Sequence, residues 1–135
     1  MKEMTVQATV ESIPAITEFI DGELARMDCP MKAQAQIDVA IDELFGNIAH
    51  YAYGDRMGEA TVRIDFDAMR QMVAISFLDS GIPFDPTKTT DPDVTLSDEE
   101  RCIGGLGIFM VRKTMDGMTY ERADDRNVLT IFKLI

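Results

Sequence analysis

The chain has 135 residues, which fits one domain with a substantial hydrophobic core, and its apolar content of 46% excludes global disorder. Its 24 Asp and Glu residues outnumber its 13 Lys and Arg residues, giving a net charge of −11. Because nucleic acids and anionic membranes are bound through Lys and Arg, the charge excludes both as extended partners, but it leaves room for a single nucleotide bound by a metal ion and backbone N–H groups.

Nothing in the sequence predicts export or membrane insertion. No stretch approaches the roughly 18 consecutive apolar residues of a transmembrane helix, and the first ten residues lack the apolar core of a signal peptide. Cys29 and Cys102 match no metal or redox spacing, and a single histidine disfavours a zinc site. We therefore expect a cytoplasmic protein with two reduced thiols.

Hydrophobic periodicity predicts a strand and two helices in the first part of the chain. Residues 5–10 alternate between polar and apolar, as in a short strand. A helical period then runs from Ser12, a candidate N-cap, to about Met27. A longer helix is expected over about residues 31–53, with Gly54 at its end.

Two strand-like runs follow over residues 60–67 and 72–79. The first alternates, which indicates one face toward solvent, whereas the second is apolar on both faces and should lie in the middle of a sheet. The short link between them predicts a hairpin.

Periodicity is lost over residues 80–103, where proline, aspartate and threonine recur. Six acidic and two basic residues lie between positions 85 and 101. A loop of this length in a compact domain is usually functional or mobile.

Glycines then open a helix over residues 104–115, and strands over 118–121 and 127–135 form a closing hairpin. Strands and helices are thus segregated along the chain. We expect one α+β domain over residues 1–135, a two-layer sandwich with a mixed, mostly antiparallel sheet and helices on one face.

Three segments carry residues suited to chemistry, and the first lies in the long helix. Glu43, Asn47 and His50 are spaced i, i+4 and i+7 and border the apolar face, so they could line a groove. The period alone favours the plainer interpretation, a solvated helix face.

The second segment begins at Asp79 and directly follows the apolar strand. A carboxylate at a strand end can present a hydrogen-bond acceptor, and Gly81 lets the backbone pass close to a ligand. The alternative is an ordinary turn, because Asp, Gly and Pro are common turn residues.

The third segment contains Gly104, Gly105 and Gly107 at the start of a helix, where backbone N–H groups can point at a phosphate. No Gly-Lys-Ser/Thr follows, so this is not a Walker loop, and no strand directly precedes it, as the dinucleotide fingerprint requires. A glycine-rich hinge is the alternative.

In this order, the segments 42–53 (DELFGNIAHYAY), 79–86 (DSGIPFDP) and 104–108 (GGLGI) resemble the GHKL ATPase superfamily with its Bergerat nucleotide-binding fold. Within it, the sequence is most similar to the anti-sigma-factor serine kinases of bacterial partner-switching systems. The resemblance extends from Thr5 to the C-terminus.

The chain departs from the superfamily pattern at two places. The helix motif Glu-x-x-x-Asn-x-x-x-His-Ala-Tyr ends here in Tyr51, Ala52 and Tyr53, with His50 one place early. Pro83 stands where many members have a second glycine.

The resemblance implies an ATP site with Mg²⁺. Glu43 would be the general base, Asn47 would bind Mg²⁺, and Asp79 would accept a hydrogen bond from the adenine amino group with Gly81 allowing close approach. Further nucleotide contacts are implied for Phe84, Arg101, Gly104, Gly105, Leu106, Gly107 and Thr130. Met110 is expected in the adenine pocket or in the core.

The implied activity is that of an ATP-dependent serine/threonine protein kinase acting on a STAS-type anti-anti-sigma protein. A sigma factor as second partner and a homodimer are implied as well. The loop over residues 85–103 would close over ATP as a lid, with its acidic excess toward a protein partner or solvent.

Two other functions remain open. The first is a nucleotide-dependent protein-binding switch of the same fold without phosphoryl transfer. The second, the catalytic fragment of a sensor histidine kinase, is disfavoured because the chain has no pair of dimerisation helices that carries a phosphoacceptor histidine.

Overall fold

The computed structural model of the chain describes residues 1–88 and 105–135. The predicted order of strands and helices is confirmed. The elements are β1 (Lys2–Gln7), α1 (Ile13–Arg26), α2 (Met31–Asn47), β2 (Glu59–Asp67), β3 (Met72–Asp79), α3 (Gly105–Thr114), β4 (Gly117–Ala123) and β5 (Arg126–Leu134). None of the helices in the described ranges is long and apolar enough to cross a membrane.

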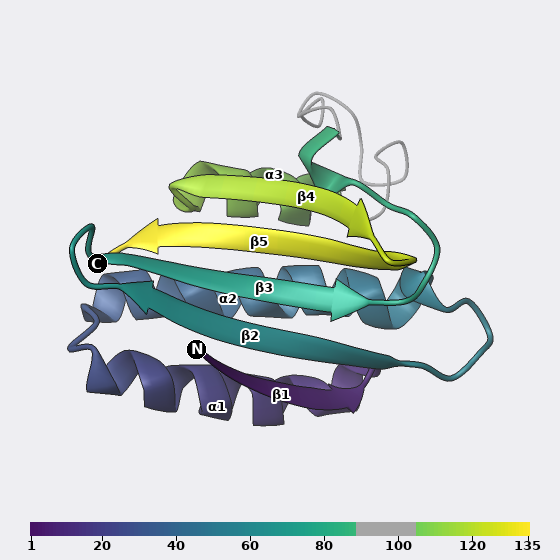
Figure 1. Cartoon of the computed structure of the whole chain (residues 1–135), viewed down its shortest axis with the longest axis horizontal. Helices are drawn as coiled ribbons and strands as arrows, with labels where there is room; N and C mark the ends of the chain where they lie inside the picture. Colours follow the sequence, from purple (N-terminus) through teal and green to yellow (C-terminus); the bar gives the residue numbers. More distant parts are fainter. Residues whose placement is uncertain (89–104) are drawn as a thin grey trace.

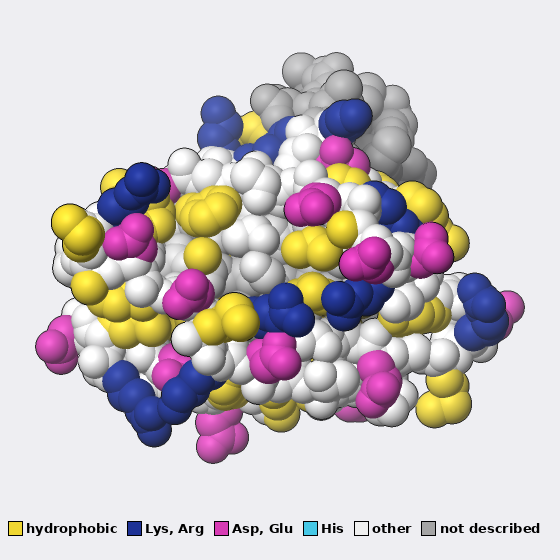
Figure 2. All heavy atoms as spheres, in the orientation of Figure 1, with side chains coloured by type: hydrophobic (Ala, Val, Ile, Leu, Met, Phe, Trp, Pro, Cys, Tyr) yellow, Lys and Arg dark blue, Asp and Glu magenta, His cyan; other side chains and the backbone are white. Residues whose placement is uncertain are grey.

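The five strands form one sheet in the order β1-β2-β3-β5-β4, with every neighbouring pair antiparallel. The predicted α+β sandwich is therefore confirmed, and β3 is central as expected. The three helices lie behind the sheet on one face, and α3 provides the crossover after which β5 returns between β3 and β4 (Figure 1). The other face has charged side chains scattered over its surface (Figure 2).

The core lies between the sheet and the helices because each element turns one apolar stripe inward. Ile16, Ile20 and Leu24 repeat every four residues on α1 and are fully buried. On β3, alternate residues such as Ile75 and Phe77 are buried. Burying each of these side chains contributes roughly 1.5–3 kcal/mol.

The bounds of the first strand and the capping bond of the first helix differ from the prediction. β1 starts at Lys2 and ends at Gln7, since it pairs with β2 over its whole length before a 3-10 turn at Val10–Ser12. Ser12 occupies the N-cap position of α1, but its hydroxyl makes no capping bond and lies 3.3 Å from the Thr9 hydroxyl instead.

The long helix has the predicted length but changes character at its end. The α-helical hydrogen bonding of α2 ends at Asn47, and the chain continues as a π-helix, η2 (Ile48–Ala52). Gly54 then ends it in the left-handed conformation, at φ +59°. Single π-turns inside helices often mark functional sites, and this one borders the cavity described below.

Candidate functional site

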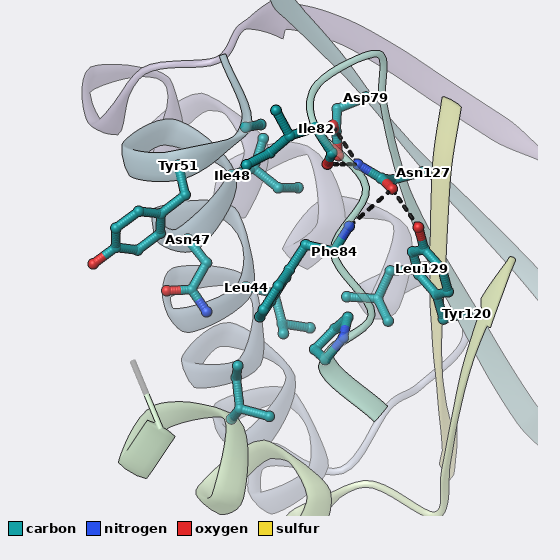
Figure 3. Close-up of a pocket in the computed structure, with 13 residues that line it drawn as sticks. Leu44, Asn47, Ile48, Tyr51, Asp79, Ile82, Phe84, Tyr120, Asn127 and Leu129 are labelled. Carbon is teal, nitrogen blue, oxygen red and sulfur yellow. Dashed lines mark hydrogen bonds between the residues drawn. The ribbon is translucent and has the colours of Figure 1, made fainter. Parts of the chain in front are cut away.

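A cavity of about 330 Å³ opens between the end of α2 with η2, the segment after β3, the start of α3, and strands β4 and β5 (Figure 3). This volume lies within the range of small-molecule sites. The lining residues are Leu44, Asn47, Ile48, Tyr51, Ala52, Asp79, Ile82, Phe84, Pro86, Ile108, Tyr120, Asn127 and Leu129. Most are apolar, so the few polar groups determine which ligands can be oriented there.

Asp79 closes one side of this cavity and is only 5% exposed. Its Oδ1 accepts hydrogen bonds from the Gly81 backbone N–H at 2.9 Å and from the Asn127 amide at 3.0 Å. Among the described residues none donates to its Oδ2. A buried carboxylate with one unused oxygen is an acceptor site for a ligand N–H.

Glycine is required at position 81 because of a contact within the protein, before any ligand is considered. A Cβ at this position would overlap the backbone carbonyl of Ala52, at the end of η2. The next residue, Ile82, donates its N–H to that same carbonyl at 2.8 Å. The close approach inferred from the sequence is therefore first an approach to η2, and it fixes the segment beside the cavity.

Tyr53 fixes the start of the same segment. Its hydroxyl donates to the Glu59 carbonyl and accepts the Ser80 N–H at 2.8 Å. The conformation just after Asp79 is thus determined by residues more than 20 positions away in the sequence, as well as by local turn chemistry.

The helix motif and the glycine motif meet on the opposite side of the cavity from Asp79. Asn47 lines the cavity, and Glu43 lies one helical turn earlier, half-buried. A Cβ on Gly107 in α3 would overlap the Glu43 carboxylate. The structure therefore brings Glu43, Asn47 and Gly107 together, although the two motifs are about 60 residues apart.

The remaining predicted glycine-motif residues are only partly described. Gly105 and Leu106 begin α3. Arg101 and Gly104, like Cys102 and most of the expected lid, lie outside the described residues. Phe84 lines the cavity as expected and is 48% exposed.

Two expected contacts are not supported. Thr130 lies on the helix-free face of the sheet, where its hydroxyl is 2.7 Å from that of Ser76, while its neighbour Leu129 faces the cavity. Successive strand residues point to opposite faces, so Thr130 turns away from the site. Met110 is 48% exposed on α3, and Ile108 lines the cavity instead.

His50 is exposed, with its ring 6.0 Å from that of Tyr51. Tyr51, four residues after Asn47, lines the cavity together with Ile48 and Ala52 of the same turn. The Glu43, Asn47, Tyr51 spacing contained that signal.

Sequence reasoning missed Asn127 and Tyr120, both in the lining. Asparagine is depleted in β-strands, and that was the available signal for Asn127. Within residues 1–88 and 105–135, no group of three or more His, Cys, Asp or Glu side chains could hold a metal ion.

The chain resembles known proteins over most of its length. Residues 6–133 match the histidine kinase-like ATPase domain family. The chain is 27% identical over 95 residues to the serine/threonine-protein kinase BtrW of Bordetella bronchiseptica, a match that spans 70% of this chain and 66% of that protein. It is 26% identical over 122 residues to the serine-protein kinase RsbW of Staphylococcus aureus, spanning 87% of this chain and 76% of that protein.

The family match agrees with the α+β fold of the chain. These matches confirm the resemblance to the anti-sigma-factor serine kinases within the GHKL superfamily. The chain belongs to the histidine kinase-like ATPase domain family.

Proposed function

We propose that the protein binds Mg-ATP in this cavity and transfers the γ-phosphate to a serine or threonine of a partner protein. The observation that carries the proposal is the convergence of Glu43, Asn47 and Gly107 on one side of a cavity that Asp79 closes on another. Figure 3 shows Asn47 and Asp79 on these different sides.

The Asp79 side fits an adenine base. Leu44, Ile82 and Leu129 supply apolar surface for a flat ring. A carboxylate only accepts hydrogen bonds at neutral pH, so it pairs with the exocyclic amino group of adenine and not with an oxo group at the same position.

The Asn47 side fits the phosphates. An amide oxygen is a ligand that Mg²⁺ accepts, and this ion commonly keeps several waters and takes few protein ligands. The absence of a larger acidic cluster among the described residues is compatible with that donor set. When bound, Mg²⁺ would offset phosphate charge, which matters in a protein with a net charge of −11.

Glu43 is the group positioned to act as base. It would take the proton of the partner's hydroxyl as that oxygen bonds to the γ-phosphorus and the bond to the ADP oxygen breaks. A general base of this kind contributes about 10²–10⁴-fold to the rate. The backbone at Gly107 leaves space for this carboxylate, which a larger residue would fill.

The partner proposed is a STAS-type anti-anti-sigma protein. The protein would act in the cytoplasm as a homodimer and would bind a sigma factor as its second partner. The resemblance to anti-sigma-factor kinases supports this choice, and so do the relatives named as serine kinases. The competing proposal is a nucleotide-dependent switch without transfer. It is favoured by the packing of Glu43 against Gly107, because a carboxylate in that contact could serve structure alone.

One assay separates these two functions. The protein is mixed with Mg²⁺, γ-labelled ATP and a STAS protein encoded in the same genome. We expect label on a partner serine or threonine, and Glu43→Gln should lower the transfer rate about 10²–10⁴-fold while ATP binding persists. Asp42→Asn, an exposed neighbour on α2, is the matched control.

Nucleotide binding by the unmodified protein without any transferred label would favour the switch. Normal Mg-ATP binding by both Asn47→Ala and Asp79→Asn would show that the cavity is not the nucleotide site.

A further inference from the structure

Asn127 is a buried polar residue to which the proposed reaction assigns no role. It is 5% exposed, and it lies directly opposite Asp79 in the register of β3 and β5. In the described part of the chain these two are the buried polar residues amid an otherwise apolar core. Burying an amide costs free energy unless its hydrogen bonds are made.

The surroundings of Asn127 fix the orientation of its amide. Its Nδ2 donates to Asp79 Oδ1 at 3.0 Å and to the Ile82 carbonyl at 2.8 Å, and both of these are acceptors. Its Oδ1 accepts from the Tyr120 hydroxyl and from Arg122 Nη1 at 3.2 Å. Since acceptors lie on one side and donors on the other, only one amide orientation satisfies both.

The same side chain ties down the segment after Asp79. Besides the bond to Ile82, its Oδ1 lies 3.4 Å from the Phe84 N–H, and Arg122 donates to the Gly81 carbonyl at 2.8 Å. Figure 3 shows Asn127 between Asp79, Phe84 and Tyr120 at the edge of the cavity. Asn127 therefore links the carboxylate, the segment after β3 and strand β4.

We propose that Asn127 is a positioning residue for nucleotide-base recognition, held by Tyr120 and Arg122. It occupies Oδ1 of Asp79 and leaves Oδ2 as the acceptor for the amino group of the base. Both Nδ2 hydrogens are already used, so Asn127 itself offers the base no donor. This inference rests on the proposed ATP-binding function and adds the group that sets base selectivity.

Asn127→Asp tests this role through the pH dependence of ATP affinity, which a purely structural role of Asn127 would not change. The new carboxyl has nearly the same shape, but an oxygen replaces Nδ2 beside Asp79 Oδ1 and the Ile82 carbonyl. Two carboxylates this close cannot both be ionised, so the pair takes up a proton as pH falls, and the protonated oxygen can again donate. ATP affinity in this variant should be low at pH 8 and recover toward pH 6.

The experiment measures dissociation constants for ATP and ITP, which lacks the amino group, across this pH range by calorimetry. In Asn127→Ala we expect ATP affinity to fall about 10–100-fold and the preference for ATP over ITP to shrink. Tyr120→Phe, which removes only a hydroxyl bonded to Asn127, should weaken ATP binding by a few-fold with the fold intact. Ser76→Ala, which loses a hydroxyl pair on the helix-free face, is the control.

The inference is overturned if wild-type protein binds ATP, Asp79→Asn abolishes that binding, and the variants at Asn127 and Tyr120 keep wild-type affinity and selectivity at every pH. If wild-type protein binds no ATP, the proposed function itself fails, which is a distinguishable result. Should Asn127→Ala not fold, the Tyr120→Phe and Asn127→Asp results still decide.

Discussion

Asp79 is buried and Asp38 is half-buried, and each carboxyl group faces a residue of another element, but their neighbours differ in kind. Asp79 on β3 faces the amide of Asn127 on β5 and the N–H of Gly81. Asp38 on α2 faces Asp21 on α1, and the Oδ1 atoms of both are buried without a donor. Burial and the adjacent carboxyl of Asp21, with which Asp38 can share a proton, raise the pKa of Asp38 to about 7.

The difference shows how the two sites use a carboxyl group. Donors around Asp79 orient one oxygen and leave the other for a ligand. Between α1 and α2 the two carboxyls can bond to each other only when one holds a proton, so this pair links helix packing to pH. Cys29 lies beside the pair, and burial, Asp38 and Asp21 raise the pKa of its thiol.

The comparison is tested most strongly at Asp79. Asp79→Asn replaces the acceptor with a donor that faces the Asn127 Nδ2, and it removes the charge that pairs with the base. We expect ATP affinity to fall by about 100-fold or more. Calorimetric titration measures this, with Asp65→Asn on the exposed end of β2 as control. Unchanged affinity would mean that the donor-lined carboxylate is only structural.

Two glycines allow the surroundings of the two carboxyl sites to be compared: Gly81 lies two residues after Asp79, and Gly22 lies next to Asp21. Gly81→Ala would push a methyl group into the Ala52 carbonyl, and we expect a loss of about 1–3 kcal/mol in the free energy of unfolding, together with weaker ATP binding. Gly22→Ala, next to Asp21 in α1, meets open space and should stabilise the helix by up to about 1 kcal/mol. Urea denaturation compares them; equal effects would show that the segment after β3 is not tightly constrained.

The carboxyl pair predicts a pH dependence of stability. Because the folded pKa of Asp38 is about 7 and its ordinary value is 3.8, the folded state binds a proton more tightly. The contribution of this bound proton to the free energy of unfolding is complete below pH 3.8 and is lost as pH rises through about 7.

Asp38→Asn puts an amide opposite Asp21, as Asn127 stands opposite Asp79, and should remove this loss. The variant should melt a few degrees above wild type at pH 8 and show little gain at pH 5, measured by thermal unfolding followed by circular dichroism. Glu18→Gln, an exposed change on α1, is the control. A pH-independent difference between Asp38→Asn and wild type would contradict a shared proton.

The smallest effect is expected at Thr130. Thr130→Val removes a hydroxyl bond to Ser76 on the helix-free face, so ATP affinity should equal that of wild type while stability falls by about 1 kcal/mol. A loss of ATP affinity comparable to that of Asn127→Ala would show that this face of β5 reaches the nucleotide.

Local patterns in the sequence were sufficient for the elements and their order. The four-residue repeat that includes Ile16 and Ile20, and the alternation along β2, each report a face that one element buries. Glycine at position 54 marks the end of the long helix by its own conformational preference. The antiparallel sheet with helices on one face followed from that order. The three motif segments were also recognisable in the sequence, and their described residues line or border one cavity.

Contacts between elements decided the rest. The sequence placed a hydroxyl at Thr130 in the site and overlooked Asn127, because which face of β5 meets the cavity depends on its register with β3, and a shift of one residue exchanges the faces. The close approach of Glu43 to Gly107 and the Asp21–Asp38 pair arise from helix packing, which no local pattern encodes. The sequence by itself determined the elements and the chemistry available; the tertiary structure decided which side chains meet, because burial and strand register are properties of the packed chain.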